Sequence, residues 1–521
     1  MIISRINYNI IILLILYHYF RRVGMINMLS KNINENILKL KKIYMNDAFI
    51  QYREFEAKYS PVKYCLVSIN GMTDNEELTI NVIRQLITSR YPKNIENDQL
   101  LEFVSKKVLT SIDLSTISNM DDILSNISYG YSLLLVDTCD KAVLINSKGF
   151  ERREVAEPDA ERVTKGPKEG FTESLLTNTS LVRKKIRNPK LKFEIMVLGN
   201  VTKTRICISY MDDIVSRQIL KEVKKRLNNI DVDIILESEY ICEYIQDRSI
   251  SFFNTIGNSE RPDVIAAKLL EGKIAIFTDG SPSVLTVPYL FIEQFEVNED
   301  YYSHYFIASF NRVLRIFCFI LSTSIPALYI ALITYHHEMI PQEIMVSIVS
   351  SREGVPFPSI VELILMLITF EILREAGSRL PQNIGQTISI VGALVLGEAA
   401  VSARLISAPI VIITALTGIT SLALPFILES VIFIKFFLLI FCSFFGLYGY
   451  IFGVMSIAIH LMNLKSFGVD YMTFFTDLNK LDIQDTAIRI PWWNINNGSK
   501  NLVNYRIKRL QKKRLKSNEK N

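Results

Sequence analysis

Three glutamates lie inside long apolar stretches in the second half of the chain: Glu362, Glu371 and Glu398. A carboxylate within a membrane-embedded helix costs on the order of 2 kcal/mol or more, so it usually faces a partner, an interface or a polar pathway. Carboxylates repeated by symmetry around a pore select for cations. The three glutamates are therefore candidates for an ion path, with Glu371 and Glu398 favoured as pore or vestibule residues.

Glu362 and Glu371 belong to the same apolar segment, Ile360–Leu373, and are nine residues apart. Nine steps of about 100° place two residues on opposite faces of a helix. The two carboxylates are therefore expected to contact different neighbours. An alternative stays open, in which both lie near the helix ends at headgroup level, where a charge costs far less.

A glycine-rich turn runs from Gly166 to Phe171 and invites comparison with phosphate-binding loops. It lacks the G-x-x-x-x-G-K-[ST] order, and Pro167 removes one of the amides that would hold a phosphate. We therefore expect a rigid turn that leads into a helix capped by Thr172. The run Ser259–Asp263 similarly predicts a helix start, with a proline near the first turn and acidic residues at the positive end of the helix dipole.

The remaining signals exclude several classes of function. The chain has no G-x-S-x-G, H-E-x-x-H or C-x-x-C pattern and only five histidines, which argues against a membrane-tethered hydrolase. The six isolated cysteines are typical of reduced, mostly buried thiols. The net charge of +5 is small for 521 residues and does not favour nucleic acid as a partner. We expect no catalytic residue, no metal and no cofactor.

The apolar second half predicts a membrane region. Only 13 of the 149 residues from Ile316 to Leu464 are charged, against 21% over the whole chain. The segment Ile316–Tyr335 carries no formal charge and is long enough to span a bilayer. Two arginines just before it place the N-terminal half in the cytosol by the positive-inside rule. Further spans are expected in three segments: Ile388–Ala403, Ile410–Ile427 and Phe436–Met462.

The C-terminal tail constrains the number of spans. The segment from Lys500 to Asn521 contains nine Lys or Arg residues against one Glu, which favours a cytosolic position as well. We therefore expect four full spans, with Ile360–Leu373 re-entrant or interfacial against the bundle. The tail is expected either on anionic headgroups of membrane lipid or as a disordered solubilising end.

The first half alternates strand-like and helix-like segments, which predicts two α/β subdomains with mixed or parallel sheets covered by helices, followed by an all-α transmembrane bundle. The first 28 residues are expected to be an extension upstream of the true start, with an interfacial anchor as the alternative. The expected divisions are the extension 1–28, a first α/β subdomain 29–147, a charged linker 148–170, a second α/β subdomain 171–310, the transmembrane region 311–464 and a cytosolic basic tail 465–521.

Several runs of residues resemble one family. Ser351–Pro358 continues into Glu371–Gly377, and the N-terminal half adds Glu260–Asp263 and Asp279–Pro282. Together these runs resemble the A subunit of the endospore germinant receptors, over about Asn34 to Trp493. The residues that carry the resemblance, and that we expect to be structural, are Gly166, Pro167, Gly170, Phe171, Glu260, Arg261, Pro262, Asp263, Arg352, Glu353, Gly354, Pro356 and Pro358.

This resemblance implies a non-enzymatic, multi-pass protein of the spore inner membrane, with the N-terminal domain and the tail cytosolic. It implies a transporter-like, nutrient-binding B subunit and a lipoprotein C subunit as partners, together with self-association. The A subunit would then form a nutrient-gated ion channel whose opening triggers germination. Two positions depart from the family pattern: Asn254 stands where proline is usual, and Arg404 adds a cation that puts inherited ion selectivity in doubt.

Two other functions remain as alternatives. A secondary transporter is disfavoured because the spans show no paired halves with broken helices. A non-conducting signalling scaffold would need the same two-part architecture without an ion path.

Overall fold

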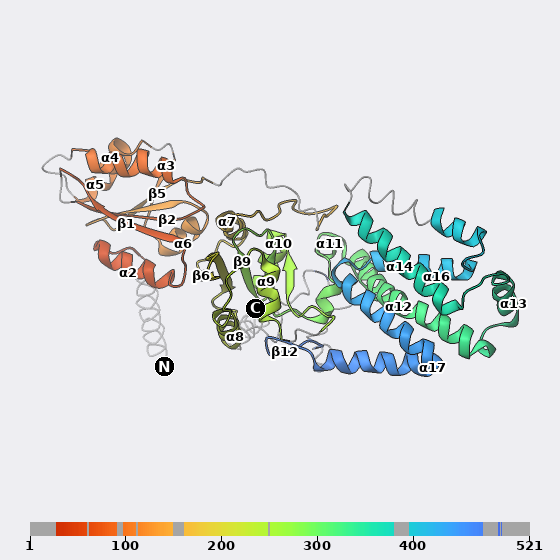
Figure 1. Cartoon of the computed structure of the whole chain (residues 1–521). Helices are drawn as coiled ribbons and strands as arrows, with labels where there is room; N and C mark the ends of the chain where they lie inside the picture. Colours follow the sequence, from red (N-terminus) through yellow and green to blue (C-terminus); the bar gives the residue numbers. More distant parts are fainter. Residues whose placement is uncertain are drawn as a thin grey trace, which may run out of the picture.

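The computed structural model describes residues 28–59, 62–90, 97–110, 113–149, 161–247, 251–379, 395–472, 488–489 and 491. Two α/β lobes lie in a row and are followed by a helical bundle (Figure 1). The expected fold class, two α/β subdomains followed by a helical region, is confirmed. Three predicted segments lie outside the described residues. These are the N-terminal extension except for its last residue, Met28, the basic tail beyond Lys500, and the first seven residues of the expected span Ile388–Ala403.

The first subdomain contains a five-stranded sheet with helices on both faces. Alternate residues of its strands point to opposite faces, as the two-residue repeat of a strand requires. One face packs on two helices, α2 and α6, and the other on four shorter helical segments. The elements are α2 (Ile33–Ile43), β1 (Ile50–Glu56), β2 (Lys63–Ile69), α3 (Asn75–Glu77), the π-helix η1 (Leu78–Ile83), α4 (Arg84–Thr88), α5 (Asn97–Phe103), the π-helix η2 (Val104–Val108), β3 (Leu114–Ile117), α6 (Met120–Ser128), β4 (Ser132–Val136) and β5 (Ala142–Ile145).

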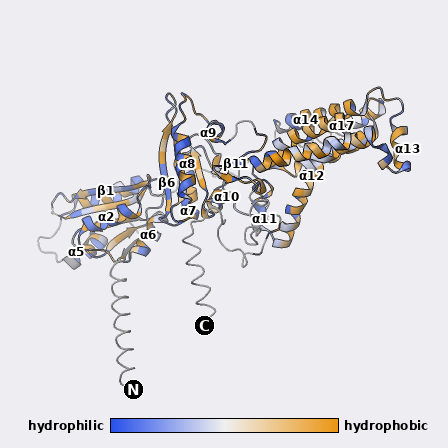
Figure 2. Ribbon diagram, turned by 90° about the horizontal axis from the view of Figure 1, so that it is seen from below, coloured by the Kyte–Doolittle hydropathy of each residue, from blue (hydrophilic) through white to orange (hydrophobic). Residues whose placement is uncertain are grey.

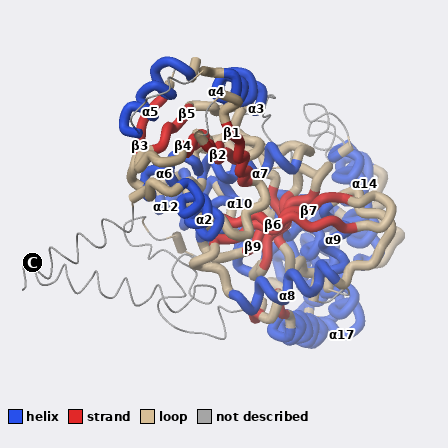
Figure 3. Tube along the Cα trace, turned by 90° about the vertical axis from the view of Figure 1, so that its left-hand side faces the viewer, coloured by secondary structure: helices blue, strands red, loops and turns tan. Residues whose placement is uncertain are grey.

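The second subdomain repeats this layered plan with a sheet of order β6-β7-β9-β10-β8. Its helices α7 and α10 cover one face, and α8 and α9 cover the other. Figure 3 shows the strands of the two sheets as separate red groups flanked by helices. The elements are α7 (Leu175–Lys185), β6 (Leu191–Leu198), β7 (Thr204–Met211), α8 (Arg217–Asn228), α9 (Ser238–Ile245), β8 (Gly257–Ser259), α10 (Pro262–Leu270), β9 (Ile274–Thr278) and β10 (Val284–Val287).

The strand pairing differs from the sequence-based expectation. All pairs described in the two five-stranded sheets are antiparallel, so the expectation of mixed or parallel sheets is wrong. Short hairpins join β4 to β5, β6 to β7 and β9 to β10, and such connections impose antiparallel pairing. The β-rich run Val232–Leu236 also predicts a strand, but the structure shows none there. This segment lies beside the β6–β7 turn, where the Val201 amide donates to Asp233 O at 3.0 Å.

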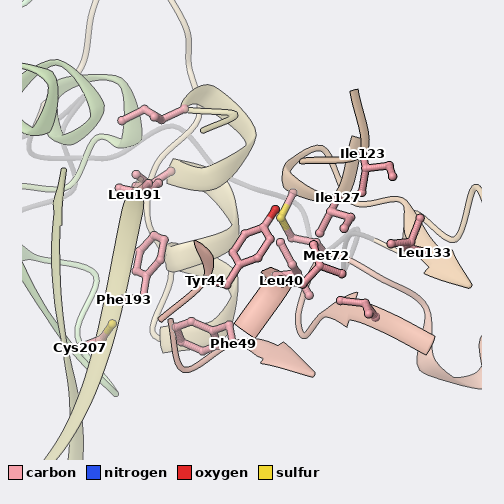
Figure 4. Packing of buried hydrophobic residues seen from close by; sticks show 14 of the residues in the cluster. Leu40, Tyr44, Phe49, Met72, Ile123, Ile127, Leu133, Leu191, Phe193 and Cys207 are labelled. Carbon is pink, nitrogen blue, oxygen red and sulfur yellow. The ribbon is translucent and has the colours of Figure 1, made fainter. Parts of the chain in front are cut away.

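The two subdomains share one hydrophobic core. Tyr44 and Phe49 of the first lie beside Phe193 of the second (Figure 4). The Phe49 and Phe193 rings meet edge to face at 5.8 Å, and the buried Asp47 and Arg183 form an ion pair at 2.7 Å. Interiors packed in this way transmit strain with little internal movement. We therefore treat the two subdomains as a single unit, the α/β body.

The helical bundle begins at α12, after two short elements that leave the α/β body. Its ribbon is predominantly apolar in Figure 2, and two segments of the described chain, Tyr305–Tyr335 and Pro425–Asn463, are long and apolar enough to cross a membrane. The elements are the 3-10 helix η3 (Phe291–Phe295), α11 (Glu299–Tyr302), α12 (Tyr305–Tyr335), the 3-10 helix η4 (His337–Met339), α13 (Gln342–Ser351), α14 (Ser359–Ser378), a helix at 395–402, α16 (Ala408–Leu422), the 3-10 helix η5 (Pro425–Ile427), α17 (Leu428–Asn463), β11 (Lys465–Ser466) and β12 (Val469–Asp470).

The helix α17 is a hairpin rather than one straight rod. Gly446 has φ 59° and ψ −137°, a conformation that interrupts the helix and favours glycine. A Cβ on Gly449 would lie 2.2 Å from Phe441 O, so the two arms are in backbone contact across the turn. The expectation of a single long span over Phe436–Met462 is wrong. Each arm has 17 or 18 residues and a length of roughly 26 Å at 1.5 Å per residue.

The segment Ile360–Leu373 lies within α14, which is a continuous helix. Its residues Leu363 and Leu367 are buried in a cluster that includes Ile410 of α16. At the other end of the bundle, the β11–β12 hairpin returns the chain to the α/β body. There Phe467 enters the core beneath α8, and Ser466 Oγ accepts from the Tyr289 amide at 3.0 Å.

Candidate functional site

Arg261 brings together two sequence runs that lie about ninety residues apart. It stands at the N-cap of α10 with 1% of its surface exposed. Its Nη2 donates to Pro167 O at 2.6 Å and to Asp263 Oδ2 at 3.1 Å, and its Nη1 donates to Glu161 O at 3.1 Å. The planar guanidinium suits this set because it directs several donors in fixed directions. The buried arginine therefore fixes the end of the linker onto the second subdomain.

The glycine-rich turn serves this packing rather than anion binding. Its Pro167 carbonyl accepts from a guanidinium, and the Phe171 amide donates to Glu260 O at 2.7 Å. Gly166 has φ +119°, and a Cβ there would lie 2.6 Å from the Tyr302 ring. Gly170 is buried beside these contacts.

The helix after this turn begins later than the sequence suggested. The N-cap of α7 is Ser174, whose Oγ accepts from the Thr177 amide at 3.4 Å. The expected cap, Thr172, instead exchanges backbone hydrogen bonds with the Asn178 side chain at 2.8 and 2.6 Å. The expectation of Thr172 as the cap is therefore wrong, because a buried asparagine inside the helix takes up its backbone groups.

Asp263 connects this region to the short segment 296–303, which we call the elbow. The Asp263 carboxylate accepts from Tyr302 Oη at 2.5 Å and from Asn298 Nδ2 at 2.8 Å. Burial, and then the hydrogen bond to Asp263, raise the pKa of Tyr302, so its hydroxyl remains a donor. Thr164 in the linker also contacts the elbow, because its amide and hydroxyl donate to Glu299 Oε1 at 2.5 and 3.0 Å.

The opposite side of the elbow holds the start of α12. Asp300 accepts from Arg315 Nη2 at 2.6 Å on both carboxylate oxygens and from Arg312 Nε at 3.3 Å. Arg312 is fully buried, and Asp300 is 3% exposed. A third contact joins Arg312 Nη1 to Glu296 at 3.5 Å. The elbow therefore links the α/β body and the bundle through charged groups removed from solvent.

A residue from the far end of the chain completes the elbow. Arg489 Nη1 donates to Ser303 O at 2.9 Å, and its backbone amide donates to Ser309 Oγ at 3.1 Å. Its guanidinium lies 5.6 Å from the centre of the Tyr301 ring, and the residue is buried. Sequence reasoning did not single out Asp300, Tyr302 or Arg489. Only the three-residue spacing of Arg312 and Arg315 before an uncharged span offered a local signal.

Glu362 is fully buried in the bundle and binds the N-cap residue of α16. Its Oε2 accepts from the Ser407 amide at 2.8 Å and from Ser407 Oγ at 2.9 Å. Arg352 Nη2 lies 3.7 Å from Glu362 Oε1. A negative charge at this place satisfies free amides and complements the helix dipole. Glu362 therefore holds α14 against α16.

The loop before α14 carries the other residues of the Ser351–Pro358 run. Gly354 has φ +88°, and a Cβ there would lie 3.1 Å from Arg404 Nη1. Arg404, one of the two positions that depart from the family pattern, thus packs against this loop. Pro358 occupies the N-cap of α14, while Glu353 and Pro356 are exposed.

The other two glutamates occupy different settings. Glu371 pairs with Lys435 of α17 at 2.8 Å and with Arg374 on its own helix. Lys435 is 2% exposed, so this pair joins α14 to the first arm of α17. Glu398 is exposed on the helix 395–402 and forms no hydrogen bond or ion pair with another described residue. One chain therefore does not bring the three carboxylates together.

Glu161 gives the body a pH-dependent contact. Its carboxylate accepts from Ser259 Oγ at 2.7 Å, and burial raises its pKa, although Lys268 and Arg261 oppose this rise. A carboxyl group whose pKa is higher in the folded state than in the unfolded state destabilises the fold as the pH rises. The loss of stability begins near the ordinary carboxyl pKa and continues through the raised pKa. Glu161→Gln keeps an acceptor for Ser259 and should make the unfolding temperature less dependent on pH, with a gain in stability at neutral pH.

Thermal unfolding of the purified full chain across this pH range checks the expectation. Glu222→Gln is a suitable control, because Arg226 lowers the pKa of that exposed carboxyl and the sign of its contribution is reversed. A Glu161→Gln chain that is less stable than the parent at neutral pH would contradict the argument.

Comparison with known proteins identifies the family. The family model described as Bacillus/Clostridium GerA spore germination protein matches residues 38–501. Spore germination protein KA of Bacillus subtilis (strain 168) is 40% identical over 469 residues, which cover 89% of this chain and 86% of that protein. Spore germination protein GerLA of Bacillus cereus is 34% identical over 472 residues, which cover 90% and 95%.

One relative and one solved structure carry different descriptions. The uncharacterized membrane protein YfkQ of Bacillus subtilis (strain 168) is 38% identical and covers 89% of this chain and 90% of its own length. The crystal structure of the N-terminal domain of the A subunit of the Bacillus megaterium spore germinant receptor GerK3 is 35% identical, covers 51% of this chain and 97% of that one, and has a TM-score of 0.41. The members of this family are receptor proteins rather than enzymes. The chain belongs to the GerA family of spore germination proteins, as the membrane-embedded A subunit of a germinant receptor.

Proposed function

We propose that this subunit oligomerises in the spore inner membrane to form a ligand-gated ion channel that triggers germination. It acts with a transporter-like, nutrient-binding B subunit and a lipoprotein C subunit. The observation that supports this most is the elbow, in which Asp300 pairs with both Arg312 and Arg315. A bundle tied in this way to a large folded body is suited to receive a movement from outside the membrane.

The elbow suggests how such a movement travels. The α/β body has one shared core, so a partner that displaces it moves the whole body. Asp263 then carries the displacement to Tyr302, and Asp300 carries it to the start of α12. Because α12 packs along both α16 and α17, its rotation or shift repacks the bundle. Interfaces of this kind have discrete arrangements, which is what a gate requires.

The proposed topology places the α/β body and the tail in the cytosol. Arg312 and Arg315 stand at the membrane entry of α12, where the positive-inside rule favours the cytosolic side. The α17 hairpin turns one expected crossing into two arms, and α14 adds a continuous helix of 20 residues. Each of these two changes adds one membrane crossing to the four that were expected, so the number of crossings stays even. Both ends of the chain therefore remain on the same side.

Glu398 is the best candidate for the ion path among the three glutamates. Glu362 and Glu371 are already engaged in holding α14 to α16 and α17. Glu398 presents its carboxylate on the surface of its helix. In an oligomer, symmetry repeats this group around a common axis, and such a ring attracts cations.

Germinant-triggered cation release from spores tests this proposal. Glu398→Gln should reduce the rate several-fold while protein levels, followed by immunoblot, stay unchanged. Glu343→Gln, an exposed carboxylate at the start of α13, is the matched control.

Three results would count against the channel. Release that survives neutralisation of Glu362, Glu371 and Glu398 together would remove them from the ion path. Nutrient uptake by the A subunit alone would favour a secondary transporter. Normal germination without any conductance in reconstituted membranes would favour a non-conducting scaffold.

A further inference from the structure

An open hollow of about 660 Å³ lies between the end of α12 and α13, and we call it the α13 pocket. Its apolar lining comes from Ile333 of α12 and from Met345, Val346, Ile348 and Val349 of α13. Val346 and Val349 are 66% and 56% exposed, so much of this apolar surface is accessible. Ligand sites typically have volumes of about 300–1,000 Å³. The pocket is therefore large enough to hold a small molecule or part of a lipid.

The pocket lies at the end of the bundle that is farthest from the α/β body, where Figure 1 shows α13. The span Ile316–Tyr335 ends just after Ile333, and its twenty residues without formal charge are enough to cross a hydrocarbon layer of about 30 Å. The helix α13 begins shortly after this span and has no buried residue. The α13 pocket therefore lies at the depth where lipid headgroups meet acyl chains.

Two charged residues that follow α13 also line the pocket: Arg352 and Glu353. Arg352 Nη2 lies 3.7 Å from Glu362 Oε1, whereas Arg352 Nε is shielded from solvent and has no hydrogen-bond partner among the described residues. Glu353 is exposed, and its carboxylate forms no hydrogen bond or ion pair with another described residue. A buried donor without an acceptor is costly. The pocket therefore favours a ligand that offers an anionic acceptor to Arg352 and a cationic donor to Glu353.

We propose that the α13 pocket binds phosphatidylethanolamine, whose headgroup carries an anionic phosphate next to a primary ammonium group. The phosphate accepts hydrogen bonds from the Arg352 guanidinium, whose planar donors match the geometry of phosphate oxygens. The ammonium group has three N–H donors for the Glu353 carboxylate. One acyl chain covers the apolar side chains of α13 and removes them from water. The proposal does not depend on whether the bundle conducts ions.

The same two residues discriminate against other phospholipids. Phosphatidylglycerol offers no cation to Glu353, and its net negative charge is repelled by this carboxylate. Phosphatidylcholine carries a quaternary ammonium group, which has no N–H donor for Glu353. Each of these lipids therefore lacks one charge-assisted hydrogen bond, and such a bond is worth roughly a tenfold change in affinity.

Lipid titrations of the purified full chain, followed by native mass spectrometry, test the proposal. Phosphatidylethanolamine, phosphatidylglycerol and phosphatidylcholine are compared with identical acyl chains. We expect phosphatidylethanolamine to bind roughly tenfold more tightly than the other two. Equal affinities for the three lipids would indicate ordinary bilayer contact and overturn the proposal. Glycerophosphoethanolamine, the same headgroup without acyl chains, should not compete; competition at the concentration of the lipid would assign the pocket to a soluble ligand and refute the lipid.

Glu353→Gln tests the headgroup contact without breaking an ion pair between described residues. The variant should bind phosphatidylethanolamine roughly tenfold more weakly and lose the preference over phosphatidylglycerol, because the carboxylate no longer attracts the ammonium group. Glu343→Gln, at the opposite end of α13, is the matched control and should bind all three lipids like the parent. A Glu353→Gln chain that keeps the parent's preference would contradict the proposed contact.

Val349→Trp tests the apolar half of the pocket. The indole ring takes the place of the acyl chain, so all three lipids should bind several-fold more weakly. Ile412→Trp adds the same ring at an exposed position of α16 outside the pocket lining and should have no effect. Unchanged lipid affinity in the Val349→Trp chain would place the lipid elsewhere and overturn the proposal.

Discussion

A receptor with Asp300→Asn is expected to lose its germination response and much of its folded population. The substitution leaves Arg312 and Arg315 without their shared carboxylate in a site where Arg312 has no exposed surface. Removing one partner of a buried ion pair costs about 3–5 kcal/mol, because an uncompensated charge remains. Germinant-triggered spore germination, protein level and thermal unfolding of the purified subunit measure the loss.

A surface ion pair in the same chain provides the control. Asp212 pairs with Arg217 at 2.7 Å, but both side chains are about half exposed. Such pairs contribute roughly 0–1 kcal/mol, so Asp212→Asn should behave like the parent. Arg312→Met introduced together with Asp300→Asn should recover part of the stability, since it removes a fully buried charge that has lost its Asp300 partner. A stable and fully responsive Asp300→Asn receptor would show that the elbow does not couple the body to the bundle.

Gly449→Ala is expected to prevent the α17 hairpin from closing. The added Cβ would lie 2.2 Å from Phe441 O, and that oxygen belongs to the backbone of the opposing arm, so no side-chain rotation relieves the clash. Overpacking in a well-packed interior typically costs about 1–3 kcal/mol, and a backbone obstacle places this case at the upper end or beyond. We expect a strong fall in the amount of monodisperse protein extracted from the membrane.

Gly397→Ala is the matched control for this prediction. Its Cβ would lie 3.3 Å from a methyl group of Val411, a side chain that can yield by a few tenths of an ångström. Fluorescence-detected size exclusion and the unfolding temperature compare the two variants. If Gly449→Ala extracts and unfolds like the parent, the arms of α17 are not in backbone contact in the membrane.

The sequence predicted elements well where a local pattern determines them. The run Leu191–Leu198 predicts a strand from its β-rich residues alone, and it coincides with β6. The opposite-face placement of Glu362 and Glu371 agrees with their contacts to different helices. Both inferences depend only on the repeat of side-chain directions along a single strand or helix, and this repeat can be read from the sequence.

Features that depend on distant residues could not be predicted in this way. Alternating helices and strands predict mixed or parallel sheets, but pairing direction depends on which strands become neighbours. The hairpin of α17 could not be predicted either, because its apolar run contains no polar turn residues that would reveal a reversal of the chain. The elbow contacts Thr164, Asp263, the start of α12 and Arg489, so its charges have no local signature apart from the spacing of Arg312 and Arg315.

The shared core of the α/β body limits how receptors of this family can be recombined. Aromatic and aliphatic residues of both subdomains, such as Tyr44, Phe49 and Phe193, fill one continuous interior. A chimera joined in the linker between the subdomains would set unmatched surfaces from two parents against each other. Domain exchanges between paralogues should therefore move the whole body from Leu29 to Ser303 as one piece, together with the matching arginines of α12 and the residue at position 489.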